Sequence, residues 1–199
     1  MKTLVINVLG GPGTGKSIFC SFLFGFLKMS QVSSEHVQEE IRRRIVGLGD
    51  INDQLDIVNK QADIIDAHLG KVKVVIADGN LIHSAVYNEH YPHNSDKEEV
   101  REAVNFRMES TAETSLNIFL NRGGDNPYEK GNRLHSFEEA QEIDSIILDF
   151  LKEKELDYIN LSAGNVHDEA FYFSRFLVSQ LKLTSDPKKV IEESKKAFF

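Results

Sequence analysis

Apolar runs along the chain alternate with segments in which apolar residues recur every three or four positions. A short continuous apolar run predicts a buried strand, whereas the recurring pattern predicts an amphipathic helix. Strands that alternate with helices are typical of a parallel sheet covered by helices on both faces. At 199 residues, the chain has the length of one such α/β domain.

The pattern predicts five strands, at residues 3–9, 31–35, 71–78, 115–121 and 156–161. The helices predicted between and after them lie at residues 18–28, 54–70, 95–114, 136–154 and 165–181. Ser136 and Glu139 have the spacing of a capping box, which marks the start of a helix. We expect a domain over residues 1–183, with a lid at about 122–135, and an appended helical tail over 184–199.

A glycine-rich segment directly follows the first predicted strand. Residues 10–17 read Gly-Gly-Pro-Gly-Thr-Gly-Lys-Ser, which fits the P-loop pattern G-x-x-x-x-G-K-[ST] between a strand and a helix. In this motif the glycines bring backbone N–H groups close to phosphate oxygens, Lys16 reaches the β- and γ-phosphates and Ser17 binds Mg²⁺. We therefore expect ATP and Mg²⁺ to bind, with nucleotide contacts from Gly10, Gly11, Gly13, Thr14, Gly15, Lys16, Ser17 and Ile18.

Two acidic residues end predicted strands. Asp78 ends the strand at 71–78, where its carboxylate is placed to hold Mg²⁺; alternatively, it only opens the following turn. Glu35 ends the strand at 31–35, where it is placed to accept the proton of a hydroxyl nucleophile or to orient that hydroxyl. The alternative for Glu35 is a solvated side chain in a run with Glu39 and Glu40, which we place inside the next helix.

The loop at residues 122–135 is long and contains glycine and proline. Arg122 follows a strand and Arg133 precedes the capped helix, so the loop is suited to close over ATP and to place guanidinium groups on the transferring phosphoryl group. A plain surface loop is the alternative, but loops of this length without regular structure are uncommon unless they have a function.

Composition narrows the class of protein. A net charge of −8 argues against general binding of nucleic-acid backbone, although the run Arg42-Arg43-Arg44 leaves a local basic cleft open. The one cysteine, Cys20, excludes an intramolecular disulfide and favours a packed apolar role in a reducing compartment, so we expect a cytoplasmic protein. No apolar run is long enough to cross a membrane. The residues His83, His90 and His93, together with Tyr87 and Tyr91, lack metal-ligand spacing, so we interpret them as walls of an acceptor pocket and not as a zinc site.

Taken in order, these motifs resemble the P-loop kinases of small molecules and nucleotides, and most closely the nicotinamide riboside kinase-like group of ATP-binding domains, which carries the AAA label. Compact phage-encoded nucleotide kinases are similar too. The resemblance implies a P-loop NTPase fold with five parallel strands in the order 2-3-1-4-5. The resemblance covers about residues 3–180. One departure is Gln38, which stands where the group has an arginine. The positions that match the group are residues 10–17, Glu35, Gln61, Asp78, Tyr87, residues 126–133 and Ile143-Asp144.

We therefore expect an ATP- and Mg²⁺-dependent kinase of a small nucleoside, nucleotide or related acceptor. The expected Mg²⁺ ligands are Ser17 and Asp78, and the expected catalytic residues are Lys16, Glu35, Asp78, Arg122 and Arg133. Two alternatives stay open. One is a kinase of the 5′-hydroxyl of a polynucleotide, and the other is a P-loop ATPase or nucleotide-binding regulator without a small-molecule acceptor. A homodimer is compatible with either function.

Overall fold

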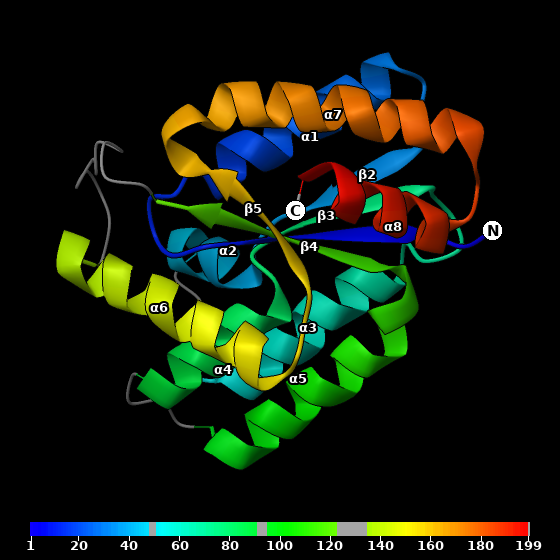
Figure 1. Cartoon of the computed structure of the whole chain (residues 1–199). Coiled ribbons are helices and arrows are strands. Elements are labelled where there is room, and N and C mark those ends of the chain that lie inside the picture. Colours follow the sequence, from blue (N-terminus) through cyan, green and yellow to red (C-terminus); the bar gives the residue numbers. More distant parts are fainter. Residues whose placement is uncertain (48–50, 91–94, 123–134, 199) are drawn as a thin grey trace.

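Five parallel strands lie between two layers of helices in the computed structural model, which describes residues 1–47, 51–90, 95–122 and 135–198 (Figure 1). The sheet has the order β2-β3-β1-β4-β5, and every neighbouring pair is parallel. The fold and the strand order predicted from the sequence are therefore confirmed. The strands are β1 (Leu4–Leu9), β2 (Ser34–Val37), β3 (Val74–Asp78), β4 (Ser115–Asn121) and β5 (Tyr158–Ser162).

The helices divide between the two faces of the sheet, as Figure 1 shows. One face carries α1 (Lys16–Met29) and α7 (Val166–Leu183). The opposite face carries α3 (Gln54–Asp66), α4 (Leu81–His90), α5 (Lys97–Thr111) and α6 (Phe137–Glu153). The remaining elements are the helices α2 (Glu40–Gly47) and α8 (Pro187–Phe198) and the short 3₁₀ turns η1 (Ala112–Thr114) and η2 (Ala163–Asn165).

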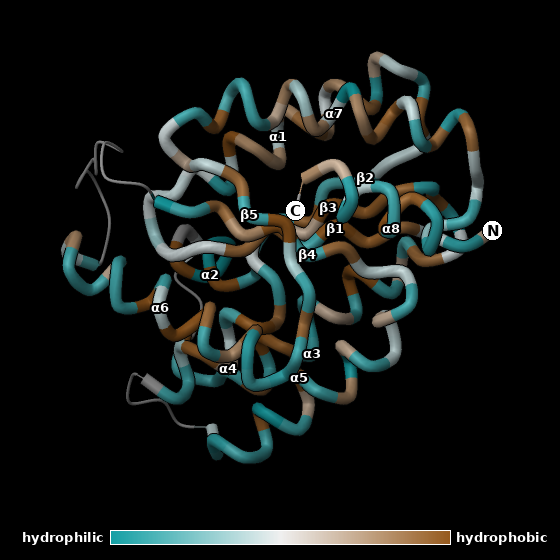
Figure 2. Tube along the Cα trace, viewed as in Figure 1, coloured by the Kyte–Doolittle hydropathy of each residue, from teal (hydrophilic) through white to brown (hydrophobic). Residues whose placement is uncertain are grey.

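Alternation along the central strands decides which side chains face which layer. Leu4, Ile6 and Val8 of β1 pack with α1 and α7, whereas Leu9 packs with the layer of α3 to α6. Figure 2 shows these central strands as hydrophobic, as expected for a parallel sheet that is buried on both faces. Asn7 shares the face of Leu9, because successive residues of a strand point to opposite sides.

The second strand differs from its prediction. It begins at Ser34 because α1 ends in a tight turn, in which Gln31 has φ of 60° and Val32 N–H donates to the Leu27 carbonyl at 2.9 Å. Glu35 is thus the second residue of β2 and does not end it, so the predicted position of Glu35 is wrong. By contrast, β4 and the capping box of Ser136 and Glu139 are as predicted.

The expected C-terminal tail forms α8, which packs onto the rest of the chain. Val190 and Ile191 are buried in the core cluster of α1 and α7, and the Phe198 ring centroid lies 5.5 Å from that of Phe173. Burial of an apolar face gives this helix a stabilising role. Among the described residues, every helix is too short or too polar to span a bilayer.

Candidate active site

The P-loop connects the end of β1 to the start of α1. Its glycines at 10, 13 and 15 have φ of 140°, 89° and 84°, a region that side-chain-bearing residues rarely adopt. Lys16 Nζ donates to the carbonyl oxygens of Gly10 at 2.7 Å and Gly11 at 3.1 Å, and the buried Thr14 hydroxyl donates to Gly11 O at 3.1 Å. The loop is therefore held by its own side chains in a curved form.

Asp78 and Ser17 lie at the same edge of the sheet, where oxygen ligands suit Mg²⁺. Asp78 is paired in register with Val8, whose side chain faces α1. The Asp78 carboxylate faces the same helix, because it lies within 4.8 Å of the sulfur of Cys20 on α1. Ser17, at the start of α1, accepts a hydrogen bond from Arg42 at 2.9 Å. Burial, with the nearby charge of Asp78, raises the pKa of the Cys20 thiol well above its ordinary value, so the thiol stays neutral. A carboxylate and a hydroxyl then form a hard donor set, which fits Mg²⁺.

Arg122 and Asp144 brace the P-loop from outside. Arg122 Nε donates to Asp144 at 2.8 Å, and Arg122 Nη2 donates to the Pro12 carbonyl at 2.6 Å. Asp144 in turn accepts the Gly11 N–H at 2.5 Å. Gly11 permits this approach, because a Cβ there would lie 2.6 Å from the Asp144 carboxylate. Arg122 is therefore buried beneath the loop, whereas the sequence placed it at the edge of a lid.

Glu39, and not Glu35, reaches the carboxyl edge of the sheet. Glu35 is half-exposed and pairs with Lys28 on α1 at 3.4 Å. Glu39 follows β2 and precedes α2, so our placement of Glu39 inside a helix is wrong. It packs against Gly79, where a Cβ would lie 2.7 Å from Glu39 Cγ. Burial raises the pKa of the Glu39 carboxyl, Lys16 opposes that shift and Asp78 adds to it.

A small polar cavity of about 10 Å³ lies beside Glu39, between α2, α3 and α4. It contains an unusual concentration of buried polar atoms that have no hydrogen-bond partner among the described residues. Such atoms in native proteins call for an explanation by a ligand, an ion or water. The four atoms in this cavity are Gln54 Oε1, Gln61 Nε2, Asn80 Nδ2 and His83 Nδ1.

His83 links this cavity to the P-loop. Its Nε2 lies 3.0 Å from the Gly10 carbonyl, an acceptor, so Nε2 carries the proton and Nδ1 is an acceptor that faces the cavity. Burial, followed by the charge of Lys16, lowers the pKa of His83 to about 3. The imidazole is therefore neutral at physiological pH. Tyr87, one turn later on α4, also lines the cavity, whereas Tyr91 and His93 lie outside the described residues, so the acceptor pocket expected of this segment stays a prediction.

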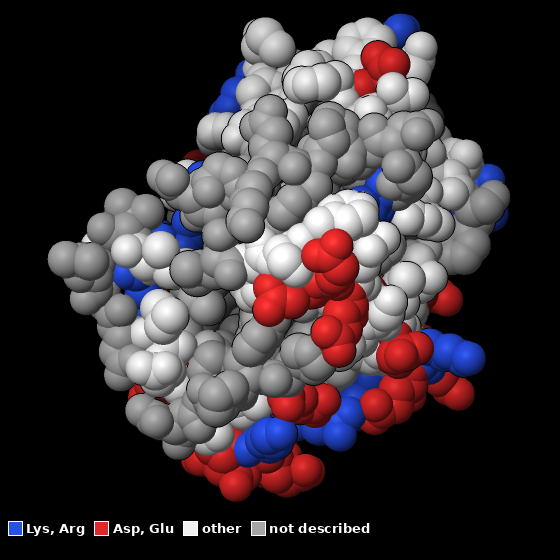
Figure 3. Space-filling view, turned by 90° about the vertical axis from the view of Figure 1, so that its left-hand side faces the viewer, with Lys and Arg blue, Asp and Glu red and all other residues white. Residues whose placement is uncertain are grey.

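The remaining sequence candidates are only partly placed. Arg133 and most of the predicted lid lie outside the described residues. Figure 3 faces the side of the molecule at which the strands end; on its described surface, acidic side chains gather near the centre and the lower edge, and Lys and Arg lie along the left side and the lower edge.

Comparisons with known proteins agree with this geometry. A family model described as an AAA domain matches residues 5–169. No curated protein sequence matches the chain. The structure is similar to that of thymidylate kinase from Candida albicans, with a TM-score of 0.59, 13% sequence identity, and coverage of 90% of this chain and 92% of that chain. At this identity the likeness establishes a shared P-loop kinase-type fold.

Proposed function

The chain belongs to the AAA domain family, and from this premise we propose that it is a kinase that transfers the γ-phosphoryl group of ATP to a nucleoside, a nucleotide or a related small molecule. The observation that supports the proposal is the group of unpartnered polar atoms between Glu39 and His83, next to the P-loop; the cavity of about 10 Å³ has room for one water molecule, so we place the acceptor at its mouth. A nucleotide switch that only hydrolyses ATP has no need for a second set of unpartnered polar groups beside its phosphate site.

The donor half of the site follows from the P-loop. Backbone N–H groups of residues 13–17 and the Lys16 ammonium would hold the phosphates, because both supply positive charge without movement of the backbone. Ser17 and Asp78 would hold Mg²⁺, which supplies charge neutralisation on the β- and γ-phosphates when bound. Arg122 acts as a positioning residue, since it is engaged by Asp144 and Pro12 beneath the loop.

The acceptor half centres on Glu39. We place the acceptor hydroxyl beside this carboxylate, which takes the hydroxyl proton as the oxygen bonds to the γ-phosphorus and ADP leaves. The raised pKa of Glu39 makes it a better proton acceptor than an exposed carboxylate. Amide groups of Gln54 and Gln61 and the neutral His83 suit an uncharged, hydrogen-bonding acceptor such as a nucleoside. Within this class, the nicotinamide riboside kinase-like group is our more specific proposal.

Acceptor-dependent formation of ADP tests the proposal. We would screen nucleosides, nucleoside monophosphates, nicotinamide riboside and a 5′-hydroxyl oligonucleotide with ATP and Mg²⁺. Glu39→Gln is expected to lower kcat by at least about 100-fold, because general base catalysis contributes 10² to 10⁴. Glu35→Gln is the matched control and is expected to retain wild-type turnover, since Glu35 pairs with Lys28 away from the cavity.

Lys16→Ala separates loss of catalysis from loss of fold. This variant is expected to unfold at a temperature near that of the wild type but to lose turnover. Release of phosphate at the same rate with and without every acceptor would refute the kinase and favour the ATPase alternative. Equal loss of activity in Glu35→Gln and Glu39→Gln would refute the role of Glu39.

A further inference from the structure

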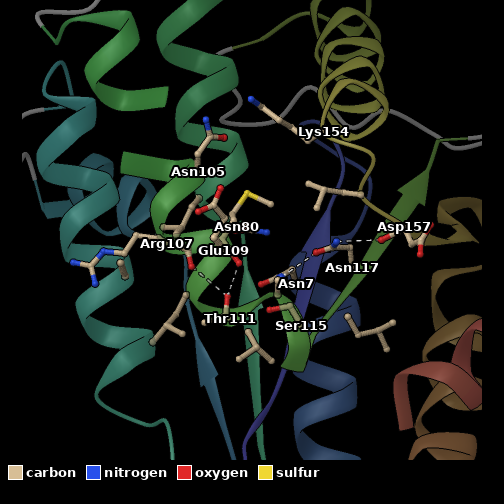
Figure 4. A pocket seen from close by; sticks show the side chains of 18 of the residues that line it. Asn7, Asn80, Asn105, Arg107, Glu109, Thr111, Ser115, Asn117, Lys154 and Asp157 are labelled. Carbon is tan, nitrogen blue, oxygen red and sulfur yellow. Dashed lines mark hydrogen bonds between the residues drawn. The ribbon is translucent and has the colours of Figure 1, made fainter. Parts of the chain in front are cut away.

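A second and larger cavity of about 400 Å³ has Asn80 in its lining but none of the P-loop residues. It extends along the sheet face from Ser115, at the start of β4, to Asn80, in the turn after β3 (Figure 4). Its roof is formed by α3 and α5, and the residues that join α6 to β5 close one side. A volume of a few hundred cubic ångströms is within the range of pockets that hold drug-sized ligands.

The floor of this cavity is polar at positions where a parallel sheet is normally apolar. Asn7 Nδ2 donates to Asn117 Oδ1 at 3.0 Å, and Asn117 Nδ2 donates to the Asp157 carbonyl at 3.1 Å (Figure 4). Both asparagines are more than nine-tenths buried, so each replaces a strand residue that would otherwise add apolar packing.

Two further polar atoms at the cavity have no partner among the described residues. Asn80, which is 5% exposed, has an unpartnered Nδ2, and Ser115 has an unpartnered and buried Oγ. A buried polar group without a hydrogen-bond partner destabilises the fold, so such groups indicate a ligand or water that completes them. Together, Asn80 Nδ2 and Ser115 Oγ offer a donor and a hydroxyl that can donate or accept.

Four of the charged residues around the cavity form two ion pairs, whereas Glu109, Lys154 and Glu155 also line it, and both glutamates are exposed. Arg107 donates to Asp66 at 2.8 Å, and Lys195 on α8 contacts Asp157 at 2.5 Å. The inner surface combines the amides with apolar side chains, which are Val5, Ala62, Ile65, Leu81, Met108 and Leu156. A wholly apolar ligand would leave the amide floor without polar partners, whereas a ligand with hydrogen-bonding groups can contact both the amides and the apolar walls.

We propose that this cavity is a second ligand site, distinct from the phosphoryl-transfer site, that binds a neutral nucleobase in the form of a nucleoside. A nucleobase presents donors and acceptors on one edge and an apolar face, which matches the amide floor and the aliphatic walls. Asparagine amides pair with base edges in this way in nucleic-acid complexes. The ribose lies toward the mouth, where hydroxyl groups stay hydrated.

The position of Asn80 couples this site to the acceptor cavity. Asn80 lines both cavities and follows Gly79, against which Glu39 packs. A nucleoside that engages Asn80 Nδ2 from the large cavity removes that donor from the acceptor cavity and lowers acceptor affinity. This coupling rests on the proposed function, whereas the binding step does not.

Calorimetric titration of the full chain with adenosine, guanosine, cytidine, uridine and thymidine tests binding. Ala112→Phe places a ring at the exposed mouth and Ser115→Phe fills the floor, and at least one nucleoside should bind about tenfold or more weakly to both variants. Ser110→Phe is the matched control, because Ser110 is exposed on α5 outside the lining and should leave binding unchanged. Thermal unfolding verifies that each variant is folded, and Ala112→Phe does not alter the core.

The competing outcomes are distinct. Failure of all five nucleosides to bind at millimolar concentration, or binding that survives both phenylalanine variants, overturns the second site whether or not the chain is a kinase. Glu39→Gln should retain the nucleoside binding that Ala112→Phe loses. Kinetics with the acceptor found in the screen test the coupling. The nucleoside should raise the KM for that acceptor several-fold in the wild type but not in Ala112→Phe. An unchanged KM for the acceptor in the wild type overturns the coupling.

Discussion

Replacement of His83 by glutamine tests whether the imidazole beneath the P-loop is held neutral. His83 is 2% exposed, and its pKa is lowered from 6.5 to about 3, chiefly by burial and then by Lys16. Because the folded pKa lies below the unfolded pKa, the unfolded chain binds the proton first. Stability is therefore lost as pH falls below 6.5, and the loss levels off near pH 3.

The magnitude follows from about 1.4 kcal/mol for each unit of pKa difference. Relative to pH 7, His83 alone should cost about 2 kcal/mol of unfolding free energy at pH 5 and about 3 kcal/mol at pH 4. Glutamine carries an amide N–H that can replace Nε2 as donor to Gly10, but it does not titrate. As pH falls, the unfolding free energy of the wild type should therefore decrease more than that of His83→Gln.

Urea unfolding at pH 7, 6, 5 and 4, followed by circular dichroism, measures this difference. Other titrating groups contribute to both proteins, so they cancel in the comparison. His167→Gln, at an exposed position on α7, controls for the replacement itself. If the unfolding free energies of the wild type and His83→Gln fall by the same amount between pH 7 and pH 4, the argument that His83 is buried in its neutral form is refuted.

Local sequence pattern was sufficient for the elements that set the fold. The P-loop, the strand at 115–121 and the capping box at Ser136 are each specified by residues within a few positions of one another. The strand order was predicted through the resemblance to P-loop kinases, because periodicity alone does not say which strands are neighbours. Residue patterns and resemblance therefore carried different parts of the prediction.

The site was less predictable because its contacts join distant segments. Glu39 was missed through an error of two or three residues in β2, which arose from the turn at Gln31. The contact of Gly11 with Asp144 spans 133 positions, and that of His83 with Gly10 spans 73. A buried asparagine such as Asn7 looks like a minor interruption of an apolar strand until its partner is known.

Two further substitutions test how α8, and the contacts of Arg122 and Asp144 with the P-loop, stabilise the fold. Val190→Ala should lower the unfolding free energy by about 2 kcal/mol, because Val190 is fully buried. Lys189 is exposed, so Lys189→Ala should change the unfolding free energy little. Equal effects of the two substitutions would refute the packing of α8 against the core. Asp144→Ala should cost about 3–5 kcal/mol, because it strips the carboxylate from a buried guanidinium. Adding Arg122→Met to Asp144→Ala should recover part of that loss, since the methionine needs no counter-charge. If the double variant is less stable than Asp144→Ala, Arg122 stabilises the loop through its hydrogen bond to Pro12 and through packing. That result would refute the argument that Asp144 is needed to neutralise the buried charge of Arg122.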